Sequence, residues 1–327
     1  MGTPRRSGWL VLLVLVLLAL VAPSTAGAAP RHGHPTGHRL FAGLEGGSGS
    51  TIGPDGALYV TENAAGRITR VDPRTGATTT YASGLPEMIP AVGFGGPVDI
   101  AFVGRTAYVL VTLVGPDVGG SEVVGLYRVD GPARFSVVAD IGAFSIAHPP
   151  ATDFFVPSGV QYALQPYRGG LLVTDGHHNR VLRVRRDGQI SVLRAFGNIV
   201  PTGLEVRGGT IYVAQAGPVP HEPEDGKVVA FRPRSTQVRE LASGSPLLVD
   251  VEFGPGHRLY ALSQGVGSGG PEGSPAEPNT GALVKARRDG TLAVVVDGLN
   301  QPTSLEFIKN TAYVVTLGGE IWKLEGV

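Results

Sequence analysis

The chain has 327 residues, in which 27 lysine and arginine side chains are balanced by 27 aspartate and glutamate side chains. This balance provides no net field toward nucleic acid or an anionic membrane surface, so neither is expected as a partner. Glycine (49) and proline (26) are abundant, yet 42% of the residues are hydrophobic, which excludes a disordered chain. The sequence contains no cysteine, so disulfides contribute nothing to the stability of an exported form.

Residues 1–28 have the three parts of a secretory signal peptide. Arg5 and Arg6 precede an apolar run from Trp9 to Val21, and small residues follow up to an Ala-x-Ala sequence that ends at Ala28. The apolar run is shorter than the roughly 20 residues of a membrane-spanning helix, so no stable membrane span is expected. We predict a secreted, extracellular protein cleaved near Ala28, exported by either the general secretory or the twin-arginine route.

A repeated pattern divides the rest of the chain at intervals of about 40 to 50 residues. Each repeat has a short apolar run centred on a tyrosine or leucine, at Tyr59, Tyr108, Leu172, Tyr212, Tyr260 and Tyr313. A second apolar run follows each one, and a tight polar turn and another apolar run precede it. The repeat is therefore strand, tight turn, strand, loop, strand, tight turn, strand. It predicts an all-β, six-bladed β-propeller with four-stranded antiparallel blades over residues 38–327, after a histidine-containing flexible tail at residues 29–37.

The two ends of the chain predict how this ring closes. The chain ends directly after the third strand of the sixth repeat, which leaves that blade without a fourth strand. The segment His38 to Gly46, HRLFAGLEG, resembles the fourth strands of the other repeats. We therefore expect it to pair with Ile321 to Leu324, since an unpaired edge would expose backbone groups and an apolar face.

The connections between strands differ in length on the two faces of the predicted ring. The first and third connections of each blade are tight turns, whereas long connections occur on the opposite face in blades two, four and five and between some blades. Long loops on one rim of a rigid scaffold are a common place for binding residues. A tolerated insertion is the alternative explanation, above all for the Gly-, Ser- and Pro-rich residues 263 to 281.

The stretch TDGHHNR in blade three places Asp175, His177, His178 and Asn179 in the second-to-third strand connection on this long-loop face. Aspartate, glycine and asparagine are typical turn residues, and adjacent histidines on an extended chain point to opposite sides. A structural turn and a ligand contact both remain open. TENAAGR places Glu62 and Asn63 at the equivalent position of blade one, and Gln215 is a further candidate on this face.

The starts of the innermost strands bring a second set of polar residues near the central channel, among them Asp99 and Asp250. Converging carboxylates there would provide the hard oxygen ligands that Ca²⁺ prefers. In the alternative interpretation each carboxylate caps its own blade connection.

Blade three, GGLLVTDGHHNRVLRVRRDGQISVL, resembles an NHL-type repeat. The mature chain, including GPDGALYVTENAAGRITRVDPRTG, resembles the ScyD/ScyE family of secreted bacterial propellers. This resemblance implies a secreted six-bladed propeller. A neighbouring superfamily, which includes SMP-30-like lactone hydrolases and strictosidine-synthase-like enzymes, implies a divalent cation held by Glu, Asn and Asp. Glu62 and Asp250 match two of these ligands by position, and no asparagine clearly matches the third.

These observations lead to two functional hypotheses. In the first, a secreted monomeric propeller binds a small molecule, glycan or protein partner on its long-loop face and has no catalysis of its own. In the second, Glu62 and Asp250 hold Ca²⁺ that polarises a lactone or ester for hydrolysis.

Overall fold

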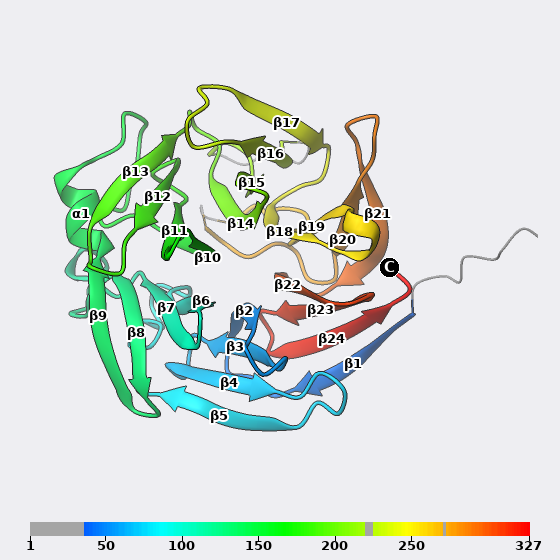
Figure 1. The fold of residues 1–327 in the computed structure, drawn as a ribbon, viewed down its shortest axis with the longest axis horizontal. Helices are drawn as coiled ribbons and strands as arrows, with labels where there is room; N and C mark the ends of the chain where they lie inside the picture. The colour runs from blue at the N-terminus through cyan, green and yellow to red at the C-terminus, as the bar shows by residue number, and fades with distance from the viewer. Residues whose placement is uncertain (1–35, 220–224, 271–272) are drawn as a thin grey trace, which may run out of the picture. The chain divides into compact units, whose positions relative to one another are not determined.

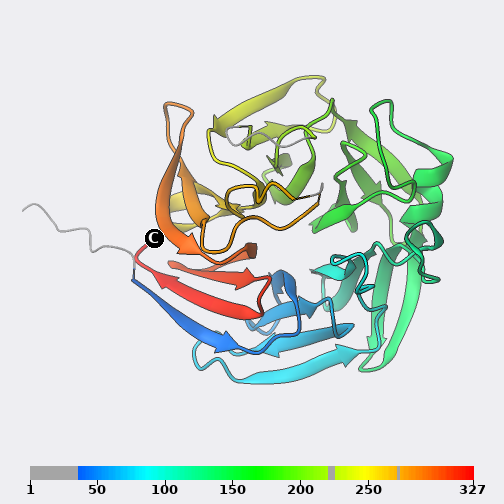
Figure 2. The ribbon, with the colours of Figure 1, turned by 180° about the vertical axis from the view of Figure 1, so that it is seen from behind.

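The computed structural model describes residues 36–219, 225–270 and 273–327 (Figure 1). In this part of the chain, 24 strands form six separate sheets of four strands, and all pairs of neighbouring strands are antiparallel. The sheets follow one another around a common centre, as Figure 1 shows and Figure 2 shows from behind. The predicted six-bladed β-propeller is therefore confirmed. The predicted signal peptide, residues 1–28, lies outside the described residues.

Each blade runs from an innermost to an outermost strand. Blade one comprises β2 (Gly47–Ile52), β3 (Leu58–Glu62), β4 (Arg67–Val71) and β5 (Thr78–Ser83). Blade two comprises β6 (Gly96–Val103), β7 (Thr106–Thr112), β8 (Gly125–Gly131) and β9 (Arg134–Asp140). Blade three comprises β10 (Gln161–Tyr167), β11 (Gly170–Asp175), β12 (Arg180–Val184) and β13 (Ile190–Ala195).

The second half of the chain continues in the same order. Blade four comprises β14 (Pro201–Arg207), β15 (Thr210–Gln215), β16 (Lys227–Phe231) and β17 (Val238–Ser243). Blade five comprises β18 (Leu248–Phe253), β19 (Leu259–Ser263), β20 (Gly281–Ala286) and β21 (Leu292–Leu299). Blade six comprises β22 (Pro302–Ile308), β23 (Thr311–Thr316), β24 (Glu320–Glu325) and, as its outermost strand, the N-terminal β1 (Thr36–Ala42).

The pairing of β1 with β24 closes the ring as the sequence predicts. His38 pairs with Lys323 and Phe41 with Ile321, and the Arg39 Nη1 atom donates to the Glu320 Oε1 atom at 2.7 Å. The strand begins at Thr36 rather than at His38. The two ends of the propeller thus share one sheet.

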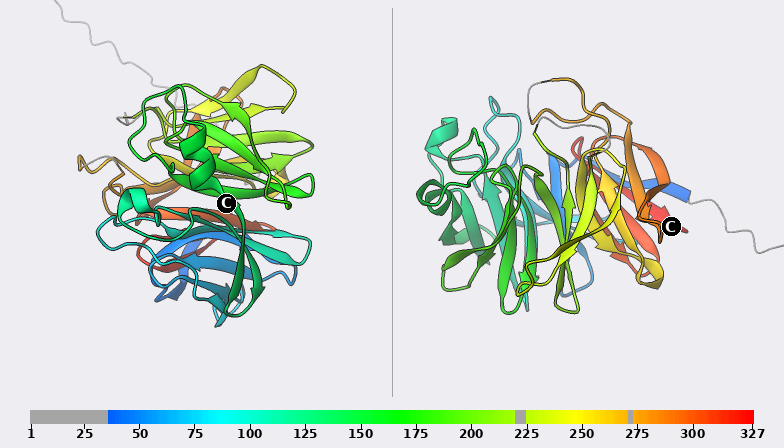
Figure 3. Two further views of the ribbon diagram at one scale, coloured as in Figure 1. Left: turned by 90° about the vertical axis from the view of Figure 1, so that its left-hand side faces the viewer. Right: turned by 90° about the horizontal axis from the view of Figure 1, so that it is seen from above.

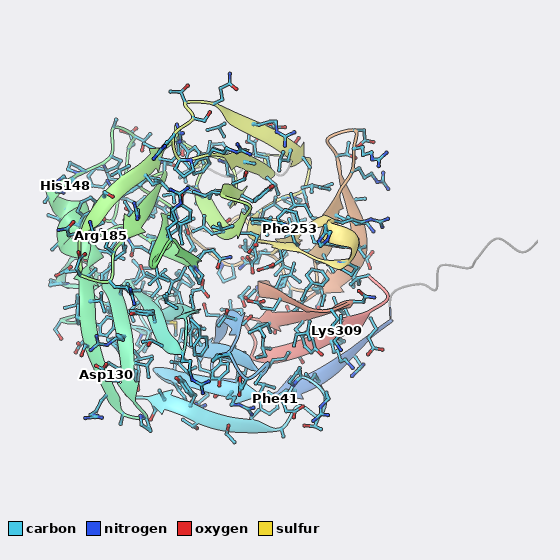
Figure 4. All side chains as sticks on the ribbon, viewed as in Figure 1. Phe41, Asp130, His148, Arg185, Phe253 and Lys309 are labelled. Atoms are coloured by element: carbon cyan, nitrogen blue, oxygen red, sulfur yellow. The ribbon has the colours of Figure 1, made fainter. Side chains whose placement is uncertain are left out.

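The hydrophobic core lies between the blades rather than in one central mass. Six clusters of buried side chains occur, and each draws its residues from two neighbouring blades, blades six and one included. In blade one, for example, Tyr59 packs edge-on against Phe102 of blade two, with ring centroids 4.9 Å apart. Figure 4 shows side chains filling the spaces between the sheets. Stability therefore depends on every blade having a neighbour on both sides.

The two faces of the ring carry different connections, in agreement with the prediction. Long segments gather on one face, and tight hairpins form the other, as the right-hand view of Figure 3 shows. One connection between blades contains a short helix that the sequence does not predict, α1 (Ile141–Ala147). The Asp140 side chain caps this helix by accepting a hydrogen bond from the Ala143 N–H at 2.7 Å. Two short 3-10 turns, Pro116–Val118 and Pro255–His257, also lie in connections.

Removal of β1 provides a test of the closure. We expect a chain that begins at Gly43 to be less stable than one that begins at Thr36 by several kcal/mol, because the edge of β24 and its apolar face would be exposed. Urea unfolding of the two chains, compared at one pH, measures the difference. Equal free energies of unfolding would show that the pairing of β1 is dispensable.

Candidate active site

A cavity of about 110 Å³ lies between the six innermost strands. All six of these strands contribute to its walls, because each blade presents alternate side chains of its first strand to the centre of the ring. Hydroxyl groups line part of it, from Ser48, Ser50, Thr51, Thr303 and Ser304. The cavity is therefore a product of the closed ring and belongs to no single blade.

Four carboxyl groups face this cavity: Asp99 from β6, Asp250 and Glu252 from β18, and Glu306 from β22. Glu205 of β14 lies beside them, and its Oε2 atom accepts a hydrogen bond from the Gln165 Nε2 atom at 2.6 Å. In the described part of the chain, no lysine, arginine or histidine lines the cavity. The centre of a protein with no net charge is thus strongly acidic.

Three of the carboxyl groups form one layer. Glu205, Glu252 and Glu306 hold the same position in three successive blades, since each lies directly opposite a tyrosine of the second strand: Tyr212, Tyr260 and Tyr313. These glutamates are not among the site residues predicted from the sequence. The signal was present in the runs TGLEV, VDVEF and TSLEF, in which a glutamate follows an apolar residue shortly before the tight turn of the repeat.

The acidic groups of the centre are difficult to ionise. Burial, opposed by backbone hydrogen bonds from Leu305 and Val251, raises the pKa of Asp250 to about 7. Burial and the charge of Asp250 raise the pKa of Glu205, also to about 7. Burial likewise raises the pKa values of Asp99, Glu252 and Glu306 well above their usual range, and neighbouring carboxylates raise them further.

The two candidate aspartates also connect neighbouring blades. The Asp99 Oδ2 atom accepts the Leu164 N–H of blade three at 2.6 Å, and the Asp250 Oδ2 atom accepts the Leu305 N–H of blade six at 2.8 Å. Each aspartate thus holds the innermost strand of the next blade. This contact crosses between blades, which differs from the expectation that each carboxylate caps its own blade connection.

Glycines allow this close approach. A Cβ atom on Gly49 would lie 2.2 Å from the Asp99 Oδ1 atom, and one on Gly203 would lie 2.5 Å from the Asp250 Cα atom. Larger residues at these two positions would push the innermost strands apart. The glycines therefore fix the width of the channel near the aspartates.

Glu62 lies on a different part of the molecule, in the hairpin between β3 and β4. Its carboxylate forms a salt bridge with Arg67 at 2.6 Å and accepts hydrogen bonds from the Glu45 N–H and the Thr69 hydroxyl. Burial favours a higher pKa for Glu62, but the hydrogen bonds from Arg67, Thr69 and Glu45 outweigh it and lower the pKa. Glu62 and Asp250 are not brought together in the lining of the cavity.

Asp175 repeats this arrangement in blade three. Its Oδ2 atom accepts a hydrogen bond from the Arg180 Nε atom at 2.8 Å, and its Oδ1 atom accepts one from Gln161 at 2.9 Å. The acid at the end of the second strand and the arginine at the start of the third strand hold the hairpin closed in both blades. Asp175 and Arg180, the two charged groups of this motif, therefore have a structural role in the hairpin.

The neighbouring candidates in the motif bind the adjacent loop. The His178 Nε2 atom lies 3.0 Å from the Val156 carbonyl oxygen, and the Asn179 amide donates to Thr152 at 3.0 Å while its oxygen accepts the N–H groups of Ile199 and Val200. Asn179 has a positive φ of 55°. His177 is directed to the other side, where its Nε2 atom lies 2.9 Å from the Tyr162 hydroxyl.

Two further candidates are buried at the ends of their strands. Gln215 ends β15 opposite Lys227, and Asn63 follows β3. Within the described residues, neither polar side-chain atom of Asn63 has a hydrogen-bond partner. Neither residue lines the cavity.

The predicted Ca²⁺ does not fit the described side chains as they are placed. In residues 36–219, 225–270 and 273–327, no group of three or more histidine, aspartate or glutamate side chains is arranged to hold a metal ion. The oxygens of Glu62 are occupied by Arg67 and Thr69, and both oxygens of Asp250 accept backbone hydrogen bonds.

No helix in the described part of the chain is long and apolar enough to cross a membrane.

Comparison with known proteins finds similar solved structures. A gluconolactonase from Xanthomonas campestris has a TM-score of 0.62 at 15% identity, covering 92% of this chain and 92% of the other. The PQQ-bound aldose sugar dehydrogenase of Streptomyces coelicolor has a TM-score of 0.60 at 13% identity, covering 89% and 98%. Virginiamycin B lyase from Staphylococcus aureus has a TM-score of 0.54 at 13% identity, covering 89% and 98%.

At these identities the likeness establishes the propeller fold. No family model and no curated relative matches the chain, so membership of the ScyD/ScyE family stays a prediction. The structural neighbours overturn one functional expectation. The three structures are of enzymes, which contradicts the hypothesis of a binding protein with no catalysis of its own.

The acidic centre predicts how stability depends on pH. Burial raises the pKa values of Asp250 and Glu205 to about 7 in the folded chain, above their values in the unfolded chain, so between about pH 4 and about pH 7 the folded state binds more protons. Their stabilising contribution is complete below about pH 4 and is lost as the pH rises through about 7. We therefore expect a lower melting temperature at pH 8 than at pH 5.5. Glu205→Gln should reduce this difference in melting temperature, and the exposed control Glu122→Gln should not. An equal difference in the two variants would contradict the assignment.

Glu62 provides a second test, of its structural role. Glu62→Ala removes the buried carboxylate that accepts hydrogen bonds from Arg67, Thr69 and the Glu45 N–H, and we expect a loss of about 2 to 4 kcal/mol in the free energy of unfolding. Glu45 contacts the same arginine at 3.2 Å but is 63% exposed, so Glu45→Ala should cost less than about 1 kcal/mol. Denaturant unfolding of both variants measures the contrast. Equal small losses would show that the Glu62 pair is not structural.

Proposed function

We propose that this protein is an exported hydrolase that opens a lactone or cleaves an ester in the central cavity. The observation that carries the proposal is Asp250, a carboxyl group facing the cavity with a pKa of about 7. Such a group is partly ionised at neutral pH and is therefore matched to proton transfer. The structural neighbour named a gluconolactonase supports a lactone as the substrate class.

The cavity provides the groups that the reaction needs. Ionised Asp250 accepts a proton from a water molecule, whose oxygen attacks the carbonyl carbon of the substrate. The bond between that carbon and the ring or ester oxygen breaks, and the leaving oxygen takes a proton from the carboxyl group of Glu252 or Glu306. Burial and neighbouring carboxylates raise the pKa values of these two glutamates, which favours the protonated form needed for this role. The N–H groups of Val251 and Leu305 hold the Asp250 carboxylate in position.

The hydrolysis described for Asp250 includes no step at a metal ion. The predicted Ca²⁺ is tested separately, by metal analysis of the purified protein before and after chelation. Glu62→Ala is a poor probe of metal binding through stability, because that substitution also breaks the pair with Arg67. Metal content is the readout that separates the two roles of Glu62.

Substitution of Asp250 tests the hydrolase directly. We expect the protein to hydrolyse members of a panel of γ- and δ-lactones and simple esters, with a rate that rises as the pH passes about 7 and Asp250 ionises. Asp250→Asn keeps an oxygen for the Leu305 N–H but cannot accept the proton, so kcat should fall by at least about 100-fold. The exposed control Asp289→Asn should keep the wild-type rate.

Melting curves of the Asp250 variant would show whether the ring remains folded. Hydrolysis by folded Asp250→Asn at the wild-type rate would contradict the role of this residue. Absence of hydrolysis across the whole panel between about pH 5 and about pH 9, with and without added Ca²⁺, would overturn the proposed function.

A further inference from the structure

A row of four aromatic rings leads from the cavity to the protein surface beside blade three. Phe94 and Tyr162 line the cavity and stack with their ring centroids 5.8 Å apart and an interplanar angle of 28°. The imidazole of His177 lies 6.1 Å from the Tyr162 ring, and Phe155 packs edge-on against His177 at 4.8 Å. Phe155 is 55% exposed, so the row ends in solvent.

The row is built by three separate connections on the long-loop face. Phe94 follows β5, Phe155 follows α1, and His177 lies in the hairpin between β11 and β12. The hydrogen bond between the Tyr162 hydroxyl and the His177 Nε2 atom fixes two of the rings relative to each other. A surface whose rings are already ordered loses little conformational entropy when a ligand binds.

Gly176 sets the position of the Tyr162 ring. A Cβ atom on Gly176 would lie 2.4 Å from the Tyr162 Cε2 atom, so the ring packs directly against the backbone of the hairpin. This glycine does not have a positive φ, so the backbone itself would accept alanine. Glycine at position 176 of the motif TDGHHNR therefore makes room for the Tyr162 ring and is not required by the backbone conformation of the turn.

The cavity has two chemically different sides. Three of the four carboxyl groups, Asp250, Glu252 and Glu306, come from blades five and six. Across the ring, Phe94 lies in the connection before blade two and Tyr162 in blade three, and the fourth carboxyl group, Asp99, lies in blade two. A lactone or ester group held at the carboxyl side would direct its remaining substituent along the aromatic row. The size of the cavity, about 110 Å³, suits the reacting group, and the row continues outward from it.

We propose that the substrate is a lactone or ester with an aromatic or other apolar ring substituent, which binds against Phe94, Tyr162 and Phe155. Offset or edge-on contact with aromatic rings, together with burial of the substituent, provides the preference. This inference rests on the proposed hydrolase for its reaction, but the binding of the ring substituent does not.

A matched pair of substrates tests the preference. We expect kcat/KM for γ-phenyl-γ-butyrolactone to exceed that for γ-butyrolactone by about tenfold or more, mainly through KM. Phe94→Ala should remove most of this preference, because it should lower kcat/KM for γ-phenyl-γ-butyrolactone by about tenfold more than kcat/KM for γ-butyrolactone.

Gly176→Ala provides a second variant that deletes no aromatic group. The new methyl group should displace the Tyr162 ring and lower the preference, whereas Gly197→Ala, where nothing lies within 4 Å, should not. A preference unchanged in both Phe94→Ala and Gly176→Ala would overturn the inference, as would equal kcat/KM for the two lactones in the wild-type protein.

Binding without reaction separates this inference from the proposed function. Calorimetry with 2-phenyltetrahydrofuran and tetrahydrofuran uses cyclic ethers that have no carbonyl group to hydrolyse. Tighter binding of the phenyl compound, weakened about tenfold by Phe94→Ala, would support the aromatic site even if no lactone were hydrolysed. Hydrolysis of lactones together with equal binding of the two ethers would overturn the aromatic site and leave the hydrolase intact.

Discussion

Pairing between the two ends of the chain is the interaction on which the rest of the structure depends. No blade has a core of its own, because the buried clusters lie between neighbouring sheets. The pairing of β1 with β24 holds blade six together, and blade six packs against blade one through residues such as Leu58 and Val315. The channel exists only when this last interface forms, since its walls come from all six blades.

Within the closed ring, the innermost strands approach each other closely enough to exclude most side chains. Gly49 and Gly203 allow Asp99 and Asp250 to lie against the preceding strands and to bind backbone N–H groups of the next blade. These contacts satisfy carboxylate oxygens that would otherwise be buried without partners. They also place Asp250 at the wall of the cavity with a fixed orientation, so the contact that holds two blades together also positions the proposed catalytic base.

The fold could be predicted from the sequence because each blade repeats the same short pattern of strands and turns. A tyrosine-centred strand between a tight turn and a loop recurs in nearly every blade, and the missing fourth strand identified the N-terminal segment that completes the last sheet. The helix α1 was missed because seven residues are too few to show a helical period.

The site was harder to predict, because its residues are related by register and not by proximity in sequence. Glu205, Glu252 and Glu306 lie in one layer only after each innermost strand is aligned with its own second strand. Glu62 had the residue type and strand position of a ligand, but position alone does not reveal that Arg67 occupies its oxygens. Phe94 lies in the connection between blades one and two and Tyr162 lies in blade three, and no spacing in the chain predicts that they stack.

The carboxyl groups at the centre of the ring lower the stability of the fold, and the fold itself does not require them. Burial disfavours every ionised group there, and neighbouring carboxylates repel one another, so apolar side chains of similar volume would stabilise the ring more. Shifted carboxyl groups of this kind are concentrated at functional sites, where stability is lower than the fold allows. Three of the four carboxyl groups of the cavity come from blades five and six, whereas Phe94 and Tyr162 come from the first half of the chain, so the complete cavity needs both halves. Closure of the ring by β1 and β24 is therefore as necessary for the proposed reaction as it is for folding.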